Sequence, residues 1–250
     1  MKDSSKVKGD IEFESRNKKF IELMSKDTKF NKQSLSWFSN AFTHEYLYHF
    51  RWLGLPIIQF PSDVLALQEI IWKLKPDLII ETGIARGGSL IFHASILQLI
   101  GKGKIVGVDV DIRPHNRTAI ENHPLSKRIK LLEGSSTDQK IVNKIKNMVK
   151  NKKTVLVILD SNHTHEHVLE ELKLYSPFVK KNSYLIVFDT IIEYLPKQSS
   201  ANRPWGKGNN PKTAVFEFLK NNKRFKIDYD IPKKLCITSS PDGFLKCTKN

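Results

Sequence analysis

The chain has 250 residues, of which 40% are hydrophobic and 27% charged, a composition that suits a globular protein with one full core. No apolar run approaches the ~18 residues that a membrane-spanning helix needs, and Cys236 and Cys247 are too few for a disulfide framework. The net charge of +15 comes chiefly from lysines spread along the sequence, which disfavours a nucleic-acid-binding patch and leaves a weak peripheral attraction to anionic membrane lipid open. Because the N-terminus has no apolar signal segment, we expect a cytoplasmic protein.

The first part of the chain is predicted to be helical. Apolar residues at helical spacing indicate helices near residues 17–25 and 35–48. The segment "PSDVLALQEIIWKLKPD" predicts a further helix that Ser62 or Asp63 caps and that ends before Pro76. Five aromatic residues in this part are assigned to helix packing or to a subunit interface: Trp37, Phe38, Phe42, Tyr46 and Tyr48.

Short apolar strands and helices alternate from residue 77 onward. Five strands are expected first, over 77–81, 104–109, 128–134, 154–160 and 183–189. Helices are expected over 87–101, 140–153, 164–179 and 212–222, and two late strands over 225–230 and 234–240. Near-continuous apolar strands between helices indicate a mostly parallel sheet covered on both faces. The fold class is therefore α/β, a Rossmann-like seven-stranded sheet with helices on both faces and a helical N-terminal extension.

Acidic residues end several of the predicted strands. Glu81, Asp109 and Asp160 close three of them, and Asp189 closes the fifth. In open α/β sheets, ligands bind at the carboxyl ends of the strands. Four acids at this edge therefore indicate a binding site.

The stretch "ETGIARGGS" joins a strand end, a glycine turn and a helix start. Gly83 and Gly87 let the backbone pass close to a ligand, and free N–H groups near Ser89 suit an anion, although a tight turn without a ligand would look similar. Asp109 lies where an acid would take both hydroxyls of a ribose, with Asp111 as the more solvated alternative. A nicotinamide enzyme would carry the stricter glycine pattern, whereas the acid Glu81 before the turn suits the amino group of a methionine moiety.

These features together resemble the class I S-adenosylmethionine-dependent methyltransferases. The resemblance implies S-adenosylmethionine (SAM) as cofactor. It places Ser135 and Ser136, in "EGSS", beside the adenine, and it places Asp160 at the mouth of the same cleft.

Three alternating histidines follow Asp160 in "ILDSNHTHEHV" and raise the question of a zinc site. The run is one residue shorter than the metallo-β-lactamase motif that it resembles and lacks the aspartate of that motif. In a helix, His163 and His167 share a face while His165 points elsewhere, so the three side chains cannot converge. We therefore exclude the zinc site and assign His165 and His167 to the helix surface.

Asp160 and His163 are instead candidates for a magnesium-assisted reaction. Mg²⁺ takes one or two carboxylates and leaves positions for waters and substrate oxygens. Asp160 and Asp189 end adjacent strands and could supply both carboxylates, and His163 could remove the proton of a substrate hydroxyl. A helix-capping or surface role is the alternative for His163.

The quoted motifs "IIETGIARGGS", "VGVDVDIRPHN", "LDSNHTHEHVLEEL", "YLIVFDT" and "PDGFLK" resemble the cephalosporin hydroxylase-named family, which includes rhamnosyl O-methyltransferases. The likeness covers roughly residues 50–250. It implies transfer of a methyl group from SAM to a hydroxyl, on a sugar of a glycolipid, polysaccharide or natural product. It also implies Asp160 and Asp189 as metal ligands, His163 as base, and a homo-oligomer. We accordingly divide the chain into a helical extension, residues 1–55, and a methyltransferase domain, residues 56–250.

One departure from the family pattern concerns the metal. Phe188 stands where the family usually has a glutamate, so the metal binds weakly, is completed by another group such as Glu193, or is absent. This departure motivates one alternative function, a methyltransferase-like binding protein without catalysis. The net charge motivates another, a nucleic-acid methyltransferase.

The segment 190–211 is predicted to be a long polar loop at the catalytic edge, and therefore a lid over the acceptor. Trp205 and Tyr194 could stack on a sugar ring, and Arg203 or Lys207 could meet a phosphate or carboxylate. Each of these four side chains is equally suited to loop packing or to solvated charge.

Overall fold

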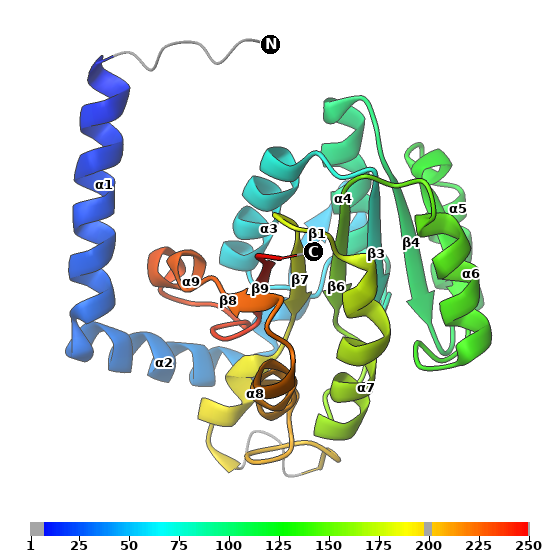
Figure 1. The fold of residues 1–250 in the computed structure, drawn as a ribbon. Helices are drawn as coiled ribbons and strands as arrows, with labels where there is room; N and C mark the ends of the chain where they lie inside the picture. Colours follow the sequence, from blue (N-terminus) through cyan, green and yellow to red (C-terminus); the bar gives the residue numbers. More distant parts are fainter. Residues whose placement is uncertain (1–7, 198–201, 250) are drawn as a thin grey trace.

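The computed structural model describes residues 8–197 and 202–249, and its centre is a seven-stranded sheet (Figure 1). The strand order is β5-β4-β3-β6-β7-β9-β8, and β9 is antiparallel to both of its neighbours while the other pairs are parallel. The strands are β3 (Leu78–Thr82), β4 (Lys104–Asp109), β5 (Ile129–Glu133), β6 (Val155–Leu159), β7 (Tyr184–Val187), β8 (Phe225–Ile227) and β9 (Phe244–Cys247). The predicted α/β class and the strand number are confirmed.

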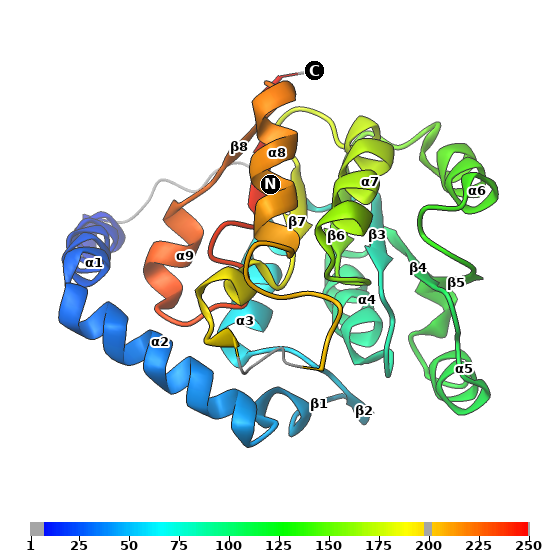
Figure 2. The ribbon, with the colours of Figure 1, turned by 90° about the horizontal axis from the view of Figure 1, so that it is seen from below.

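Helices cover both faces of this sheet, and Figure 2 shows the two layers edge-on. One layer holds α3 (Pro61–Leu74), α4 (Gly88–Ile100) and α5 (Pro114–Glu121). The other holds α6 (Gln139–Val149), α7 (His165–Tyr175) and α8 (Pro211–Asn221). Strand residues alternate between the two layers, so each face of the sheet has its own apolar core. Short 3-10 turns follow or join these elements at η2 (Ser126–Arg128), η3 (Ser176–Phe178) and η4 (Thr190–Tyr194).

The prediction of a strand over 234–240 is wrong. Residues Asp230–Leu235 form a short helix, α9, and the last strand is β9, built from the "PDGFLK" motif. The segment after α9 turns inward instead, because Ser239 donates its backbone N–H and its hydroxyl to the buried carboxylate of Asp63, both at 2.9 Å. A long-range polar contact thus overrides a local β preference.

The predicted cap of α3 is also wrong, and the contact between Asp63 and Ser239 is part of the reason. Neither Ser62 nor Asp63 caps α3, because Phe60 is the residue before its first turn. Ser62 Oγ donates to the carbonyl of Ile237, and Asp63 is 0% exposed. Both side chains therefore bond residues far along the chain and not the free backbone N–H groups at the start of α3.

The N-terminal extension consists of α1 (Lys8–Lys26), α2 (Thr28–Thr43), η1 (Tyr46–Tyr48) and a small hairpin, β1 (Arg51–Trp52) and β2 (Leu55–Pro56). In Figure 1, α1 stands beyond α9 at one side of the molecule, and the two are joined by an ion pair between Glu22 and Lys233 at 3.0 Å. A division of the chain between residues 55 and 56 stays a prediction. Within residues 8–197 and 202–249, no helix combines the length and the apolar character that a membrane crossing requires.

Candidate active site

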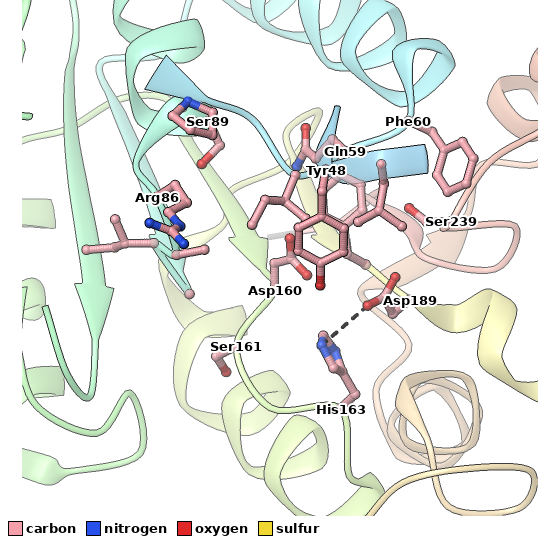
Figure 3. Close-up of a pocket in the computed structure, with 18 of the residues that line it drawn as sticks. Tyr48, Gln59, Phe60, Arg86, Ser89, Asp160, Ser161, His163, Asp189 and Ser239 are labelled. Carbon is pink, nitrogen blue, oxygen red and sulfur yellow. Dashed lines mark ion pairs between the residues drawn. The ribbon is translucent and has the colours of Figure 1, made fainter. Parts of the chain in front are cut away.

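A cavity of about 480 Å³ opens at the carboxyl ends of the central strands (Figure 3). Its walls include the glycine turn after β3, the ends of β4, β6 and β7, and the segment that leads from the hairpin to α3. Among the predicted site residues, those that line it are Gly83, Ser89, Asp109, Asp160, His163 and Asp189. Three of the four acids at the strand ends, Asp109, Asp160 and Asp189, therefore share one cavity, as the parallel order of β4, β3, β6 and β7 allows.

Gly83 brings two of these strand ends into backbone contact. The Asp160 N–H donates to the carbonyl of Thr82 at 2.9 Å, and a Cβ at position 83 would lie 2.0 Å from the Asp160 carbonyl oxygen. Gly83 also has φ +85, a conformation that side chains other than glycine rarely adopt. The glycine turn therefore fixes the position of Asp160 as well as its own.

Asp160, His163 and Asp189 come together in the cavity. Each offers one ligand atom within 4.8 Å of the others, and the distance from His163 Nε2 to Asp189 Oδ2 is 3.3 Å. Burial raises the pKa of the Asp160 carboxyl well above its usual range, and the negative charges of Asp189 and Glu81 raise it further. Two carboxylate oxygens in such a place fit a divalent cation such as Mg²⁺, whose charge would relieve this repulsion. The imidazole nitrogen of His163 lies beside them, where it can serve as a base.

The other two histidines take no part in this group, as predicted, but they are not free surface residues. His165 is the first residue of α7; its Nδ1 is 2.8 Å from Thr213 Oγ1 and its Nε2 is 3.1 Å from Glu217, both on α8. His167 Nε2 lies 3.2 Å from Ser161 Oγ. His163 precedes α7 and points into the cavity, so the start of the helix separates the three side chains.

Asp109 organises the glycine turn from the next strand. Its Oδ2 accepts from the backbone N–H of Ile84 at 2.8 Å and of Ala85 at 3.3 Å, while its Oδ1 accepts from the Asp111 N–H at 3.2 Å. A carboxylate has lone pairs for further donors, and Asp109 faces the cavity. Its predicted contact with a ribose stays compatible with this geometry.

Glu81 lies behind the cavity wall. It is 1% exposed; its Oε1 accepts from Ser89 Oγ, and its Oε2 lies 2.7 Å from His93 Nε2. Gly87, with φ +82, caps the start of α4 and does not line the cavity. The predicted contact of Glu81 with a methionine amino group stays a prediction, and the side chain that reaches the cavity here is that of Ser89.

Ser135 and Ser136 follow β5 and lie outside the cavity lining. Ser135 Oγ lies 2.9 Å from Thr137 Oγ1. Ser136 is buried, with its carbonyl bonded to the Tyr175 hydroxyl and its Oγ 3.1 Å from His167 Nε2. Their proposed place beside an adenine is not tested by these contacts.

Of the four side chains of the predicted acceptor loop singled out from the sequence, Trp205 and Arg203 line the cavity, together with Ile192 and Leu195 of the same loop. Trp205 packs edge-to-face on His163, with ring centroids 4.8 Å apart at 82°, and the guanidinium of Arg203 lies 5.4 Å from the Trp205 ring. Tyr194 and Lys207 do not line the cavity. Part of the predicted loop, residues 198–201, lies outside the described residues.

Several cavity residues were not singled out from the sequence as site residues. They are Tyr48, Gln59, Phe60, Arg86 and Ser239, which Figure 3 shows around the acids. Gln59 and Phe60 belong to the stretch "WLGLPIIQFPSD", which directly precedes α3 and is the part of the sequence from which they could have been predicted. Gln59 is 6% exposed, and no described donor reaches its Oε1. Tyr48 borders the cavity, although the sequence assigned it to helix packing or a subunit interface.

A sequence model described as rhamnosyl O-methyltransferase/CmcI matches residues 44–248. The chain belongs to this family. It is 32% identical over 202 residues to a rhamnosyl O-methyltransferase of Mycobacterium tuberculosis, covering 78% of this chain and 76% of that protein. A rhamnosyl O-methyltransferase of Mycobacterium leprae is 30% identical over 202 residues, covering 78% and 81%.

Solved structures share the fold of this family member. A CmcI apo structure superposes with a TM-score of 0.57 at 19% identity, over 81% of this chain and 78% of that one. An O-methyltransferase from Bacillus cereus in complex with SAH superposes with a TM-score of 0.50 at 14% identity, over 87% and 91%. Both likenesses concern the arrangement of helices and strands.

The departure at Phe188 leaves an apolar wall in the cavity of this family member. Phe188 is 2% exposed, and its N–H donates to the Leu159 carbonyl at 3.0 Å. Glu193, the alternative ligand, is occupied elsewhere, because its Oε2 accepts from the Gly208 N–H at 2.8 Å and from Asn210 Nδ2 at 2.6 Å. Burial opposes ionisation of Glu193, but these two donors and the positive charges of Lys212 and Lys207 together outweigh it and lower the pKa. Glu193 therefore anchors the acceptor loop.

Proposed function

We propose that this protein is a SAM-dependent O-methyltransferase that methylates a hydroxyl of a sugar, with a divalent cation at Asp160 and Asp189. The meeting of Asp160, His163 and Asp189 in the cavity of the glycine turn carries the proposal, because it joins acid, base and cofactor loop in one space. Support for the sugar comes from the mycobacterial relatives, which are rhamnosyl O-methyltransferases. Rhamnosides are therefore the first acceptors to try.

The cofactor would lie along the glycine turn. Gly83 and Ser89 line its path, and Gly87 sets the start of α4 beside them. Asp109 receives the ribose hydroxyls, and Glu81 acts from behind through Ser89. Ser135 and Ser136 are assigned to the adenine side, and Asp160 to the mouth of the cleft. Bound SAM supplies a methyl group on a positively charged sulfur, which a nucleophilic oxygen attacks.

The chain's own residues would activate the acceptor oxygen. A cation at Asp160 and Asp189 would lower the pKa of the acceptor hydroxyl and hold its oxygen. His163 Nε2 accepts the hydroxyl proton, and the Asp189 carboxylate, 3.3 Å away, stabilises the resulting imidazolium. The oxygen forms a bond to the methyl carbon as the carbon–sulfur bond breaks, leaving S-adenosylhomocysteine (SAH).

Aromatic side chains make the acceptor side of the cavity suitable for a sugar. Trp205 and Tyr48 border it, and indole and phenol rings can pack on the apolar face of a pyranose. Arg203 adds a donor at the same side. A homo-oligomer, a peripheral association with anionic lipid and a cytoplasmic location stay predictions.

Calorimetric titration with SAH, first with Mg²⁺ and then with EDTA, tests the cofactor assignment. We expect SAH to bind in both conditions, because the glycine turn and Asp109 do not need the cation to keep their bonds. A screen of rhamnosides with SAM then tests transfer, which EDTA should abolish. No SAH binding in either condition would overturn the proposal.

A further inference from the structure

Asp63 is a fully buried carboxylate that does not line the cavity, yet its partners lead to Asp189. We propose that Asp63 is a positioning residue that holds Asp189 in place for the cation, acting through the strap formed by residues 238–243. This inference rests on the proposed function only in assuming that a cation binds at Asp160 and Asp189.

The first step links α3 to the strap. Asp63 Oδ1 accepts from Thr238 Oγ1 at 2.5 Å, and its Oδ2 accepts from the N–H and the Oγ of Ser239, both at 2.9 Å. Thr238 Oγ1 in turn accepts from the Ser240 N–H at 2.9 Å. One buried carboxylate thus fixes the first three residues of the strap against the start of a helix.

The second step links the strap to the chain before Asp189. Ser240 Oγ donates to the Val187 carbonyl at 2.9 Å, and the Val187 N–H donates to the Gly243 carbonyl at 2.9 Å. A Cβ at Gly243 would lie 1.8 Å from the Val187 oxygen, so strap and strand end touch backbone to backbone. The position of the end of β7 therefore depends on the position of the strap.

The third step links the strap to the chain after Asp189. The Ile191 N–H donates to the Ser239 carbonyl at 3.1 Å, and the Asp242 N–H donates to Thr190 Oγ1 at 3.1 Å. Asp189 is thereby enclosed between two attachments to one strap. Figure 3 shows Ser239 beside Asp189 at the same side of the cavity.

Asp189 needs such attachments because of its backbone conformation. Its φ of 59° and ψ of 22° place it in the left-handed region, which an aspartate enters more readily than most residues but still at a cost in free energy that its surroundings must offset. If the strap shifted, Asp189 could relax toward an ordinary conformation and turn its carboxylate away from Asp160 and His163. Asp63 is the buried residue that prevents this shift.

The test measures Mn²⁺ affinity by electron paramagnetic resonance on the full chain, alongside urea unfolding. We expect Asp63→Ala to weaken Mn²⁺ binding roughly tenfold, the lower end of the loss that follows removal of a group bonded directly to a metal ligand, because Asp63 acts through the strap. Asp63→Asn, which keeps an oxygen acceptor and the shape of the side chain, should recover affinity to within a few-fold. Thr238→Val removes the two hydrogen bonds of the Thr238 hydroxyl and leaves those of Ser239 with Asp63. It should weaken Mn²⁺ binding by a smaller factor, and it serves as the test if Asp63→Ala does not fold.

Asp77→Ala is the matched control. Asp77 also holds a distant segment through its carboxylate, which accepts the backbone N–H groups of Lys153 and Thr154, both at 3.0 Å, but it lies before β3, at the end of the strands away from the cavity. It should lower stability without changing Mn²⁺ affinity. Unchanged Mn²⁺ affinity in folded Asp63→Ala or Thr238→Val would overturn the inference alone, as would equal weakening by Asp63→Ala and Asp63→Asn, which would indicate charge in place of position. No Mn²⁺ binding by the unmodified chain would overturn the cation of the proposed function and this inference with it.

Discussion

Replacing Gly83 by alanine tests whether the contact between the loops after β3 and β6 holds the active site. Gly83 has φ +85, and an added Cβ would lie 2.0 Å from the carbonyl oxygen of Asp160. Gly101, with φ +83, is the matched control, because an added Cβ there meets nothing within 4 Å. Both substitutions impose the same backbone strain, and only one adds a collision.

The two variants should differ in a predictable way. Left-handed strain costs each about 1–2 kcal/mol of unfolding free energy. Cβ atoms essentially never approach other atoms within 3.0 Å, so in Gly83→Ala the backbone at Asp160 must move by about 1 Å. A displacement of that size at a catalytic group costs about a hundredfold in turnover. Gly101→Ala should keep its turnover.

Urea unfolding, SAH titration and methyl transfer to a rhamnoside measure these effects together. We expect Gly83→Ala to lose more stability than Gly101→Ala and to lose turnover as well. Equal losses in the two variants would refute the reasoning, because the collision with Asp160 would then have no consequence.

His163→Ala should lower turnover by about 10²–10⁴-fold, as loss of a general base does, while SAH affinity stays the same; unchanged turnover would remove His163 from the mechanism. Trp205→Ala should raise the KM for the acceptor more than it lowers kcat, and Trp205→Phe should restore the KM, whereas an unchanged KM would place the sugar elsewhere. Burial, which outweighs its hydrogen bonds, raises the pKa of Asp63 from 3.8 to about 6, so the folded state binds the proton more tightly than the unfolded state. The unfolding free energy relative to Asp63→Asn should therefore fall by about 2 kcal/mol as the pH rises from about 4 to 7; a pH-independent difference in urea unfolding would contradict this.

The sequence predicted the elements that local patterns encode. The five parallel strands were placed to within about two residues at each end, a normal margin, because buried strands read as continuous apolar runs bounded by turns. The meeting of acids at their carboxyl ends was also predictable, since Asp160 and Asp189 follow β6 and β7, which pair side by side in parallel. The exclusion of a three-histidine zinc site also came from spacing, on the assumption that one helix holds all three residues; the structure instead starts α7 at His165 and leaves His163 before it.

The predictions that failed concern residues whose partners are far along the chain. Ser62 and Asp63 carry the side chains of helix caps, and no local pattern shows that Ile237 and Ser239 will claim them. The bonds between Asp63 and Ser239 also explain why the predicted strand over 234–240 does not form and why residues 238–240 belong to the strap instead. Glu193 looked like a substitute ligand by proximity in sequence, but its partners Gly208 and Asn210 hold it in the acceptor loop.

The sequence by itself determined the α/β fold, the glycine turn, the acids at the strand ends and the family to which the chain belongs, because periodicity and residue type are properties of short segments. Only the tertiary structure decided what each polar side chain contacts. Glu81 lies behind Ser89, and Asp189 is held from both sides by residues 238–243. A buried polar group must find a partner wherever the fold provides one, and that partner is set by packing between segments far apart in the sequence.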